Sequence, residues 1–278
     1  MKKKFKGKAL YQPSGKAAEY SPWAVNFYTG CSNDCDYCYC TRGVMSHVWD
    51  NKPHLKKCFR SQEHALRTFC QEVGQNLDEL RKKGILFSFT TDPLLPETRA
   101  MTFASMVSAN YLKVPVKVLT KRADFLDHIP HDLDKSLVAF GFTLTGHDDQ
   151  EKNASTNEER IKAMKELHQL GYRTWVSIEP VITAEKSLDM LDRTLEFCDL
   201  YKVGLISGKG NEFYKSGEID GMVTQLATYS QFVKIYVKES VLDYLWVERD
   251  RLNEEFDGHF VNADYNIFAH DINVTNKI

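Results

Sequence analysis

Three closely spaced cysteines are the residues of this sequence best suited to carry chemistry. They are Cys31, Cys35 and Cys38, in the stretch Gly30-Cys-Ser-Asn-Asp-Cys-Asp-Tyr-Cys. An iron–sulfur cubane is normally held by four thiolates, one on each iron. The C-x3-C-x2-C spacing supplies three, which leaves one iron without a protein ligand. An open position on a redox cluster is available for chemistry, as an open position on zinc is.

A fourth cysteine, Cys40, leaves a second class of site open. It could complete a four-thiolate cluster or a zinc site, although C-x-C after C-x2-C forces neighbouring side chains into one tetrahedron. No second C-x2-C pair follows, because Cys58, Cys70 and Cys198 are isolated. Seven cysteines in 278 residues do not favour a disulfide framework. The alternatives are therefore an open-iron cluster and a non-catalytic iron–sulfur or zinc protein that uses Cys40.

The composition is that of an ordinary soluble globular protein, with 42% hydrophobic and 27% charged residues. The 36 basic and 38 acidic residues give a net charge of −2, which does not favour a nucleic-acid partner but leaves one open. The basic start is followed by no apolar segment, which indicates a solvated arm rather than a signal peptide. No apolar run approaches a membrane span. Free cysteines without an export signal lead us to expect a cytoplasmic protein.

Short apolar runs rich in β-branched residues alternate with longer amphipathic stretches along the chain. This alternation predicts an α/β fold in which helices cover a parallel sheet. Seven strands are too few for a closed barrel of eight, so an open or partial (β/α) barrel is favoured. The predicted strands are Trp23–Tyr28, Ile85–Thr90, Val114–Thr120, Leu137–Thr145, Tyr172–Glu179, Leu200–Ser207 and Phe232–Val237.

Three amphipathic stretches are predicted to be helices. Ser61–Leu80 begins with a residue suited to be an N-cap. Glu158–Leu170 carries apolar residues three apart, opposite a polar face that includes Arg160, and Gly171 follows as a stop. Ala184–Phe197 repeats the pattern. These helices provide the layer that such a sheet needs.

Polar residues follow five of the predicted strands. Ligands of parallel sheets bind at the carboxyl ends of the strands, and the cysteine loop lies at the end of the first strand. Turn formers are common there, but five polar ends in series favour a site for a zwitterionic, ribose-bearing ligand. The ends are Thr90-Thr91-Asp92-Pro93, Thr120-Lys121-Arg122, Thr143-Leu144-Thr145, Ser177-Ile178-Glu179-Pro180 and Ser207-Gly208-Lys209-Gly210.

The cysteine loop also has an aromatic residue, Tyr37, directly before its third cysteine. The pattern C-x3-C-x-aromatic-C resembles the signature of the radical S-adenosylmethionine (SAM) superfamily. Thr91-Asp92-Pro93 and Thr120-Lys121 resemble its spore photoproduct lyase-like branch. The resemblance covers Trp23 to Gly208. It implies a partial barrel of about six parallel β/α units and a [4Fe–4S] cluster, held by the three cysteines, whose open iron chelates SAM.

The resemblance also implies a reaction and its partners. Asp92 would meet the amino group of SAM and Lys121 its carboxylate, both as charge-assisted pairs. An electron from the cluster would cleave SAM to methionine and a 5′-deoxyadenosyl radical, which would abstract hydrogen from an unidentified substrate. We therefore expect a radical SAM enzyme supplied by a reductase or by a flavodoxin- or ferredoxin-type electron donor.

Two later strand ends complete the implied SAM site. The ribose would lie near Thr143 or Thr145, and the adenine and ribose near Ile178 or Glu179. The chain differs from spore photoproduct lyase in its near-neutral charge and in lacking a basic segment that could contact duplex DNA. A photoproduct lyase-like repair protein is therefore only an alternative. The expected parts are an N-terminal arm (1–22), the barrel (23–240) and a C-terminal extension (241–278).

Overall fold

The computed structural model describes residues 4–42, 46–256 and 259–269. Eight strands form one sheet in the order β1-β2-β5-β6-β7-β8-β9-β10. In this sheet β2, β5, β6, β7, β8, β9 and β10 pair in parallel, and β1 pairs antiparallel with β2 at the edge. Their bounds are β1 Leu10–Tyr11, β2 Ala24–Val25, β5 Ile85–Phe87, β6 Val116–Thr120, β7 Val138–Thr143, β8 Arg173–Val181, β9 Leu200–Leu205 and β10 Lys234–Val237.

A separate two-stranded ribbon, β3 Tyr28–Thr29 and β4 His54–Leu55, flanks the cysteine loop. Because β1 and β10 lie at opposite ends of the strand order, the sheet pairing described does not close into a ring. The fold is thus an α/β partial barrel, as predicted.

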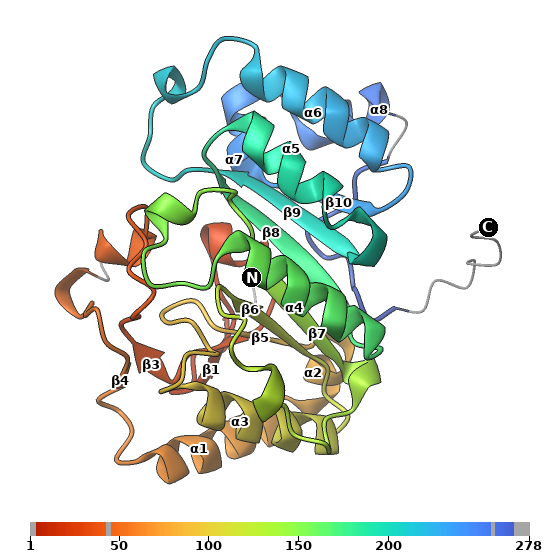
Figure 1. The fold of residues 1–278 in the computed structure, drawn as a ribbon. Coiled ribbons are helices and arrows are strands. Elements are labelled where there is room, and N and C mark those ends of the chain that lie inside the picture. The colour runs from red at the N-terminus through yellow and green to blue at the C-terminus, as the bar shows by residue number, and fades with distance from the viewer. Residues whose placement is uncertain (1–3, 43–45, 257–258, 270–278) are drawn as a thin grey trace.

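Helices cover the outer face of the sheet (Figure 1). Helix α3 contacts β6, α4 contacts β7 and β8, α5 contacts β8, and α7 contacts β9. The helices of the described residues are α1 Gln62–Gln75, α2 Leu77–Lys83, α3 Arg99–Tyr111, α4 Asn157–Gln169, α5 Ala184–Asp192, α6 Glu218–Tyr229, α7 Glu239–Leu245 and α8 Arg249–Glu255.

Side chains along the parallel strands alternate between the helix layer and the concave interior of the sheet. Val176 and Ile178 of β8 belong to the main core, whereas Trp175 packs in a second cluster with Ala24 and Leu200. These interior residues lie in the first parts of their strands and fill that end of the barrel. Space is therefore left at the carboxyl ends.

The predicted strands are all present, with shifted ends. The largest difference concerns Trp23–Tyr28, which forms only the short strand β2 before Tyr28 begins β3. Asn26 explains the break, because its side-chain Oδ1 accepts the backbone N–H of Phe89 at 2.8 Å in place of a strand ladder. The chain is thereby redirected toward the cysteine loop.

The helix predictions need three corrections. The predicted helix Ala184–Phe197 is too long, because α5 ends at Asp192 and Leu195–Phe197 forms a separate 3-10 turn. Ser61 does cap α1 by accepting from His64 N at 3.1 Å, but the predicted single helix Ser61–Leu80 is wrong. Asn76 leaves the helical conformation and donates its side-chain amide to the Glu72 carbonyl, so α1 ends there and α2 begins. Arg160 was predicted on the polar face of its helix, yet its side chain is fully buried.

The N-terminal segment is built into the barrel. The Glu72 carboxylate accepts the backbone N–H groups of Lys8, Ala9 and Leu10 at 2.7–3.0 Å, which holds β1 against α1. Further along, Lys202 Nζ reaches the carbonyls of Glu19 and Tyr20 from inside the sheet. These bonds carry the Tyr20 side chain into the interior.

The segment after α8 returns to the same interior. Val261 N donates to the carbonyl of Ile235 at 2.9 Å, and Ile267, 3% exposed, packs in the second cluster. The segment therefore covers the filled end of the barrel. Among the described residues, no helix is long and apolar enough to span a membrane.

Candidate active site

The carboxyl ends of the parallel strands surround a cavity of about 350 Å³. Cys31, Cys35 and Cys38 line one part of it, so the structure brings the three predicted cluster ligands to the predicted strand ends. Polar residues at or after the ends of six strands line the rest: Thr91 and Asp92 after β5, Lys121 after β6, Thr143 at the end of β7, Glu179 near the end of β8, Ser207 after β9 and Lys238 after β10.

The backbone at the start of the cysteine loop is tightly packed. Cys31 N donates to the carbonyl of Asp50 at 3.1 Å. Gly30 has a φ of +89°, and a Cβ at this position would lie 2.1 Å from the carbonyl oxygen of Lys52. Only glycine permits this conformation and this approach. The loop is therefore held against the segment before β4.

The thiols of the loop differ in pKa. A hydrogen bond from the Cys40 thiol lowers the pKa of Cys38 to about 6, and burial opposes this shift only in part. Burial, together with the charge of Asp92, raises the pKa of Cys31 to about 12, and burial raises that of Cys35 to about 11. Because the thiolate is the metal-binding form, Cys38 is prepared for binding and the other two thiols would release protons.

The donor set fits a cluster better than a single ion. No three His, Cys, Asp or Glu side chains within the described ranges gather closely enough to hold one metal ion. A cubane takes each thiolate on a different iron, so its ligands line a space rather than converge on one point. Cys31, Cys35 and Cys38 are free, partly exposed and on the wall of the same cavity. They suit a [4Fe–4S] cluster.

Asp92 organises the strand ends. Its Oδ1 accepts from Thr120 Oγ1 at 2.6 Å and from Leu94 N at 3.0 Å. Its Oδ2 accepts from Lys121 N at 2.7 Å and from Asn33 Nδ2 at 2.8 Å. These four bonds use the acceptor capacity of a carboxylate. The structure thus gives Asp92 a positioning role, and its contact with a ligand amino group stays a prediction.

Lys121 carries its charge into the cavity beside the cysteines. Its Nζ lies 5.4 Å from the centre of the Tyr37 ring. Burial disfavours the ammonium form, but attraction to Cys35 and Glu151 outweighs burial and raises the pKa of Lys121. A charged ammonium is therefore available to a ligand carboxylate.

Successive side chains of a strand point to opposite faces of the sheet, so only some of the remaining predicted residues line the cavity. Thr143 and Glu179 point to the interior and line the cavity. Ile178, the neighbour of Glu179, packs among the helices in the main core. Thr145 lies beyond the end of β7, where its Oγ1 accepts from His147 N at 3.2 Å, and it is absent from the cavity lining. One residue of each predicted pair is thus placed at the site.

Two further polar groups lie in the cavity wall: Thr91, which belongs to a predicted polar strand end but was given no role, and Asn33, which was not predicted. Asn33 Oδ1 and Thr91 Oγ1 are buried and have no hydrogen-bond partner. The bond from Asn33 Nδ2 to Asp92 fixes which atom of the amide is the free acceptor. A buried polar atom without a partner is costly, so both atoms suit a bound ligand. The Asn-Asp turn within the cysteine loop was the available sequence signal.

The cavity lining also contains a second group of bonded polar residues. The Tyr20 hydroxyl donates to Glu179 Oε2 and lies 2.7 Å from Ser177 Oγ. Lys238 Nζ also donates to Glu179 Oε2, at 2.6 Å, and lies 4.2 Å from the centre of the Tyr20 ring. Tyr20 was not predicted at the site, because residues 1–22 gave no motif that would place it there.

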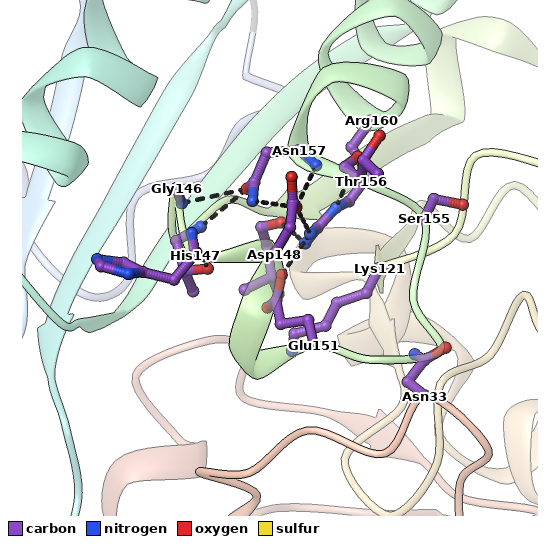
Figure 2. A network of polar contacts seen from close by, with 12 residues as sticks. Asn33, Lys121, Gly146, His147, Asp148, Glu151, Ser155, Thr156, Asn157 and Arg160 are labelled. Atoms are coloured by element: carbon purple, nitrogen blue, oxygen red, sulfur yellow. Dashed lines mark hydrogen bonds and ion pairs between the residues drawn. The ribbon is translucent and has the colours of Figure 1, made fainter.

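An ion pair behind the cysteine loop was also missed. Figure 2 shows Glu151 and Arg160 in a polar network that extends to Asp148 and Asn157. Tyr37 joins it by donating its hydroxyl to Glu151 Oε1. The side chain of Tyr37, the aromatic residue of the motif, is thus held in place by Glu151.

Comparison with known proteins agrees with this arrangement. The fold is similar to the structure of a cysteine-to-alanine mutant of spore photoproduct lyase, with a TM-score of 0.60 and 14% identity over 81% of this chain and 79% of that one. It is also similar to spore photoproduct lyase complexed with a dinucleoside spore photoproduct, with a TM-score of 0.51 and 12% identity over 86% of this chain and 65% of that one. No curated protein matches the sequence. A family model described as the radical SAM superfamily matches residues 25–198, and the chain therefore belongs to the radical SAM superfamily.

Proposed function

We propose that this protein is an enzyme that binds one [4Fe–4S] cluster and SAM and acts on a substrate still to be identified. The observation that carries the proposal is the meeting of Cys31, Cys35 and Cys38 with charged and polar strand ends around one cavity. When bound, the two cofactors would supply reductive cleavage of SAM to methionine and a 5′-deoxyadenosyl radical. Membership of the superfamily supports this chemistry.

The residues around the cysteines suit the methionine part of SAM. Lys121 offers a buried ammonium to its carboxylate. The unpartnered Oδ1 of Asn33 would accept from its amino group, and the charge of Asp92 behind Asn33 favours an ammonium there. Asp92, whose acceptor positions are filled by the protein, would thus act on the amino group through Asn33. Thr91 Oγ1 is a further free polar atom on this side.

The strand ends farther along the sheet suit the nucleoside part. We assign Thr143 to the ribose and Glu179 to the adenine and ribose, because both side chains line the cavity. Thr145 and Ile178 are not proposed as contacts, since neither lines it. Tyr20 and Lys238 hold the Glu179 carboxylate in place.

The proposal also names partners. An external reductase, or a flavodoxin- or ferredoxin-type protein, would deliver the electron, and a cytoplasmic setting would keep the free cysteines reduced. A nucleic-acid substrate is the second candidate, because one structural neighbour is complexed with a dinucleoside spore photoproduct. The net charge of −2 does not favour it.

The test is anaerobic reconstitution followed by iron and sulfide analysis. Wild-type protein should hold about four irons per chain. Replacing Cys31, Cys35 or Cys38 with Ala should abolish the cluster, whereas Cys40→Ala should retain it. The control is Cys198→Ala, which removes a buried thiol that does not line the cavity.

Two results would count against the proposal. Zinc bound without iron under anaerobic handling would indicate a zinc protein. Loss of the cluster in Cys40→Ala, to the same extent as in Cys38→Ala, would indicate a four-thiolate cluster without an open iron.

A further inference from the structure

The ion pair between Glu151 and Arg160 lies behind the cysteine loop and takes no part in the cofactor contacts proposed above. Arg160 Nη2 pairs with Glu151 Oε2, and the side chains of both are fully buried (Figure 2). A buried ion pair contributes little net stability, because desolvation of both charges offsets their attraction. Stability alone therefore does not account for this pair, and its contacts indicate what else it does.

On one side, Glu151 holds the cysteine loop. The Tyr37 hydroxyl donates to Glu151 Oε1. The backbone of Glu151 forms an antiparallel bridge with that of Cys35, and Asp36 N donates to the carbonyl of Gln150 at 3.0 Å. The loop segment from Cys35 to Tyr37 is thus fastened through both its backbone and its side chain.

On the other side, Arg160 holds the end of β7. Its Nη1 donates to the carbonyl of Thr143, the residue assigned to the ribose. Its Nε donates to the Thr156 carbonyl at 3.3 Å, and its Nη2 lies 3.5 Å from Asp148 Oδ1. The guanidinium therefore connects β7, the start of α4 and Glu151 through one rigid group.

We propose that Glu151 and Arg160 are positioning residues that hold the three cysteines in register with the SAM-facing end of β7 and fix the charge beside the cluster. The inference rests on the proposed function. Replacing either side chain with a neutral one changes the net charge of the pair by one unit at a site shielded from solvent. The Glu151 backbone bridges to Cys35 and its carboxylate accepts from Tyr37, so the charge of Glu151 lies directly beside the cysteine loop.

The positioning part is tested on metal-free protein by amide hydrogen exchange of residues 31–41. Glu151→Ala should speed exchange there by about tenfold or more, from the loss of a charged hydrogen bond. Glu151→Gln keeps an acceptor for Tyr37 and should restore rates near those of the wild type. Tyr201→Phe is the control, because it removes a buried hydroxyl that bonds to Thr194 and Leu191 instead.

The charge part is tested on the reconstituted protein by the midpoint potential of the cluster. Glu151→Gln leaves the Arg160 cation unbalanced and should shift the potential to more positive values. Arg160→Gln leaves the Glu151 carboxylate unbalanced and should shift it to more negative values. A residue needed only for folding would not give shifts of opposite sign.

The two experiments distinguish a failure of this inference from a failure of the proposed function. If the wild type takes up no cluster, the proposed function fails, while hydrogen exchange still decides the positioning role. The inference is overturned if Glu151→Ala exchanges like the Tyr201→Phe control. It is also overturned if both Gln variants keep the wild-type potential.

Discussion

A single carboxylate, Asp92, links the cysteine loop to the ends of two strands. The sequence predicted Asp92 as a ligand contact from its place after a strand. The structure instead gives all its acceptor positions to the protein, and leaves Asn33 Oδ1 as the free atom. Strand position could be predicted from the sequence, but hydrogen-bond partners could not, because Asn33 is distant in the chain. Lys121 lines the cavity, and its contact with a ligand carboxylate stays a prediction.

Lys121→Met should weaken SAM binding by about ten- to a hundredfold, because a buried charge-assisted hydrogen bond of roughly 1.5–3 kcal/mol is lost. Affinity is measured by calorimetry on reconstituted variants of equal iron content. The control is Lys152→Met, which changes an exposed lysine that pairs with Asp36 of the cysteine loop. Equal affinity of the Lys121→Met and Lys152→Met proteins would show that Lys121 does not contact the ligand.

At the scale of elements, the spacing at which side chains return to the same face of a strand or helix decides which residues reach the site. The alternation of β8 turns Glu179 inward and Ile178 outward, so this choice could have been made from the sequence. In α4, the spacing of Asn157, Arg160 and Met164 places Arg160 on the buried stripe. Its charge suggested an exposed face, but the buried carboxylate of Glu151 and the carbonyls of Thr143 and Thr156 make the burial of the guanidinium acceptable.

Lys117 of β6 provides a pH-dependent test of the interior. It points to the concave face, where its Nζ donates to the Tyr20 carbonyl at 3.2 Å, and burial lowers its pKa to about 8 from 10.5. Between these values the unfolded chain binds more protons, so the free energy of unfolding should rise with pH across this window. Lys117→Met should reduce that rise by up to about 3 kcal/mol.

Urea unfolding of the metal-free protein at several pH values across that window checks this expectation. Lys234→Met is the matched control, because Lys234 is an exposed lysine on β10 and should leave the wild-type pH dependence intact. An identical rise in the Lys117→Met protein and the wild type would show that the ammonium of Lys117 is not desolvated in the folded state.

At the scale of the whole molecule, the sequence predicted the parallel strands, the open barrel and the cysteine loop at its mouth. These features follow from local apolar patterns and from the rule that ligands bind at carboxyl ends. The segments that fill the barrel could not be predicted. Tyr20 and Ile267 meet inside the sheet from opposite ends of the chain, and such contacts leave no local periodic signal.

The central claim is that the cavity supports reductive cleavage of SAM, and the most direct measurement is the 5′-deoxyadenosine formed under anaerobic conditions with dithionite. Reconstituted wild-type protein should release it slowly even without substrate, because in our proposal Lys121 and the neighbouring polar groups would hold SAM beside the cysteines. Cys35→Ala, which cannot hold the cluster, corrects for reduction in free solution. The account predicts clearly more 5′-deoxyadenosine from the wild type than from Cys35→Ala. Equal amounts from the two proteins, with a full cluster in the wild type, would contradict it.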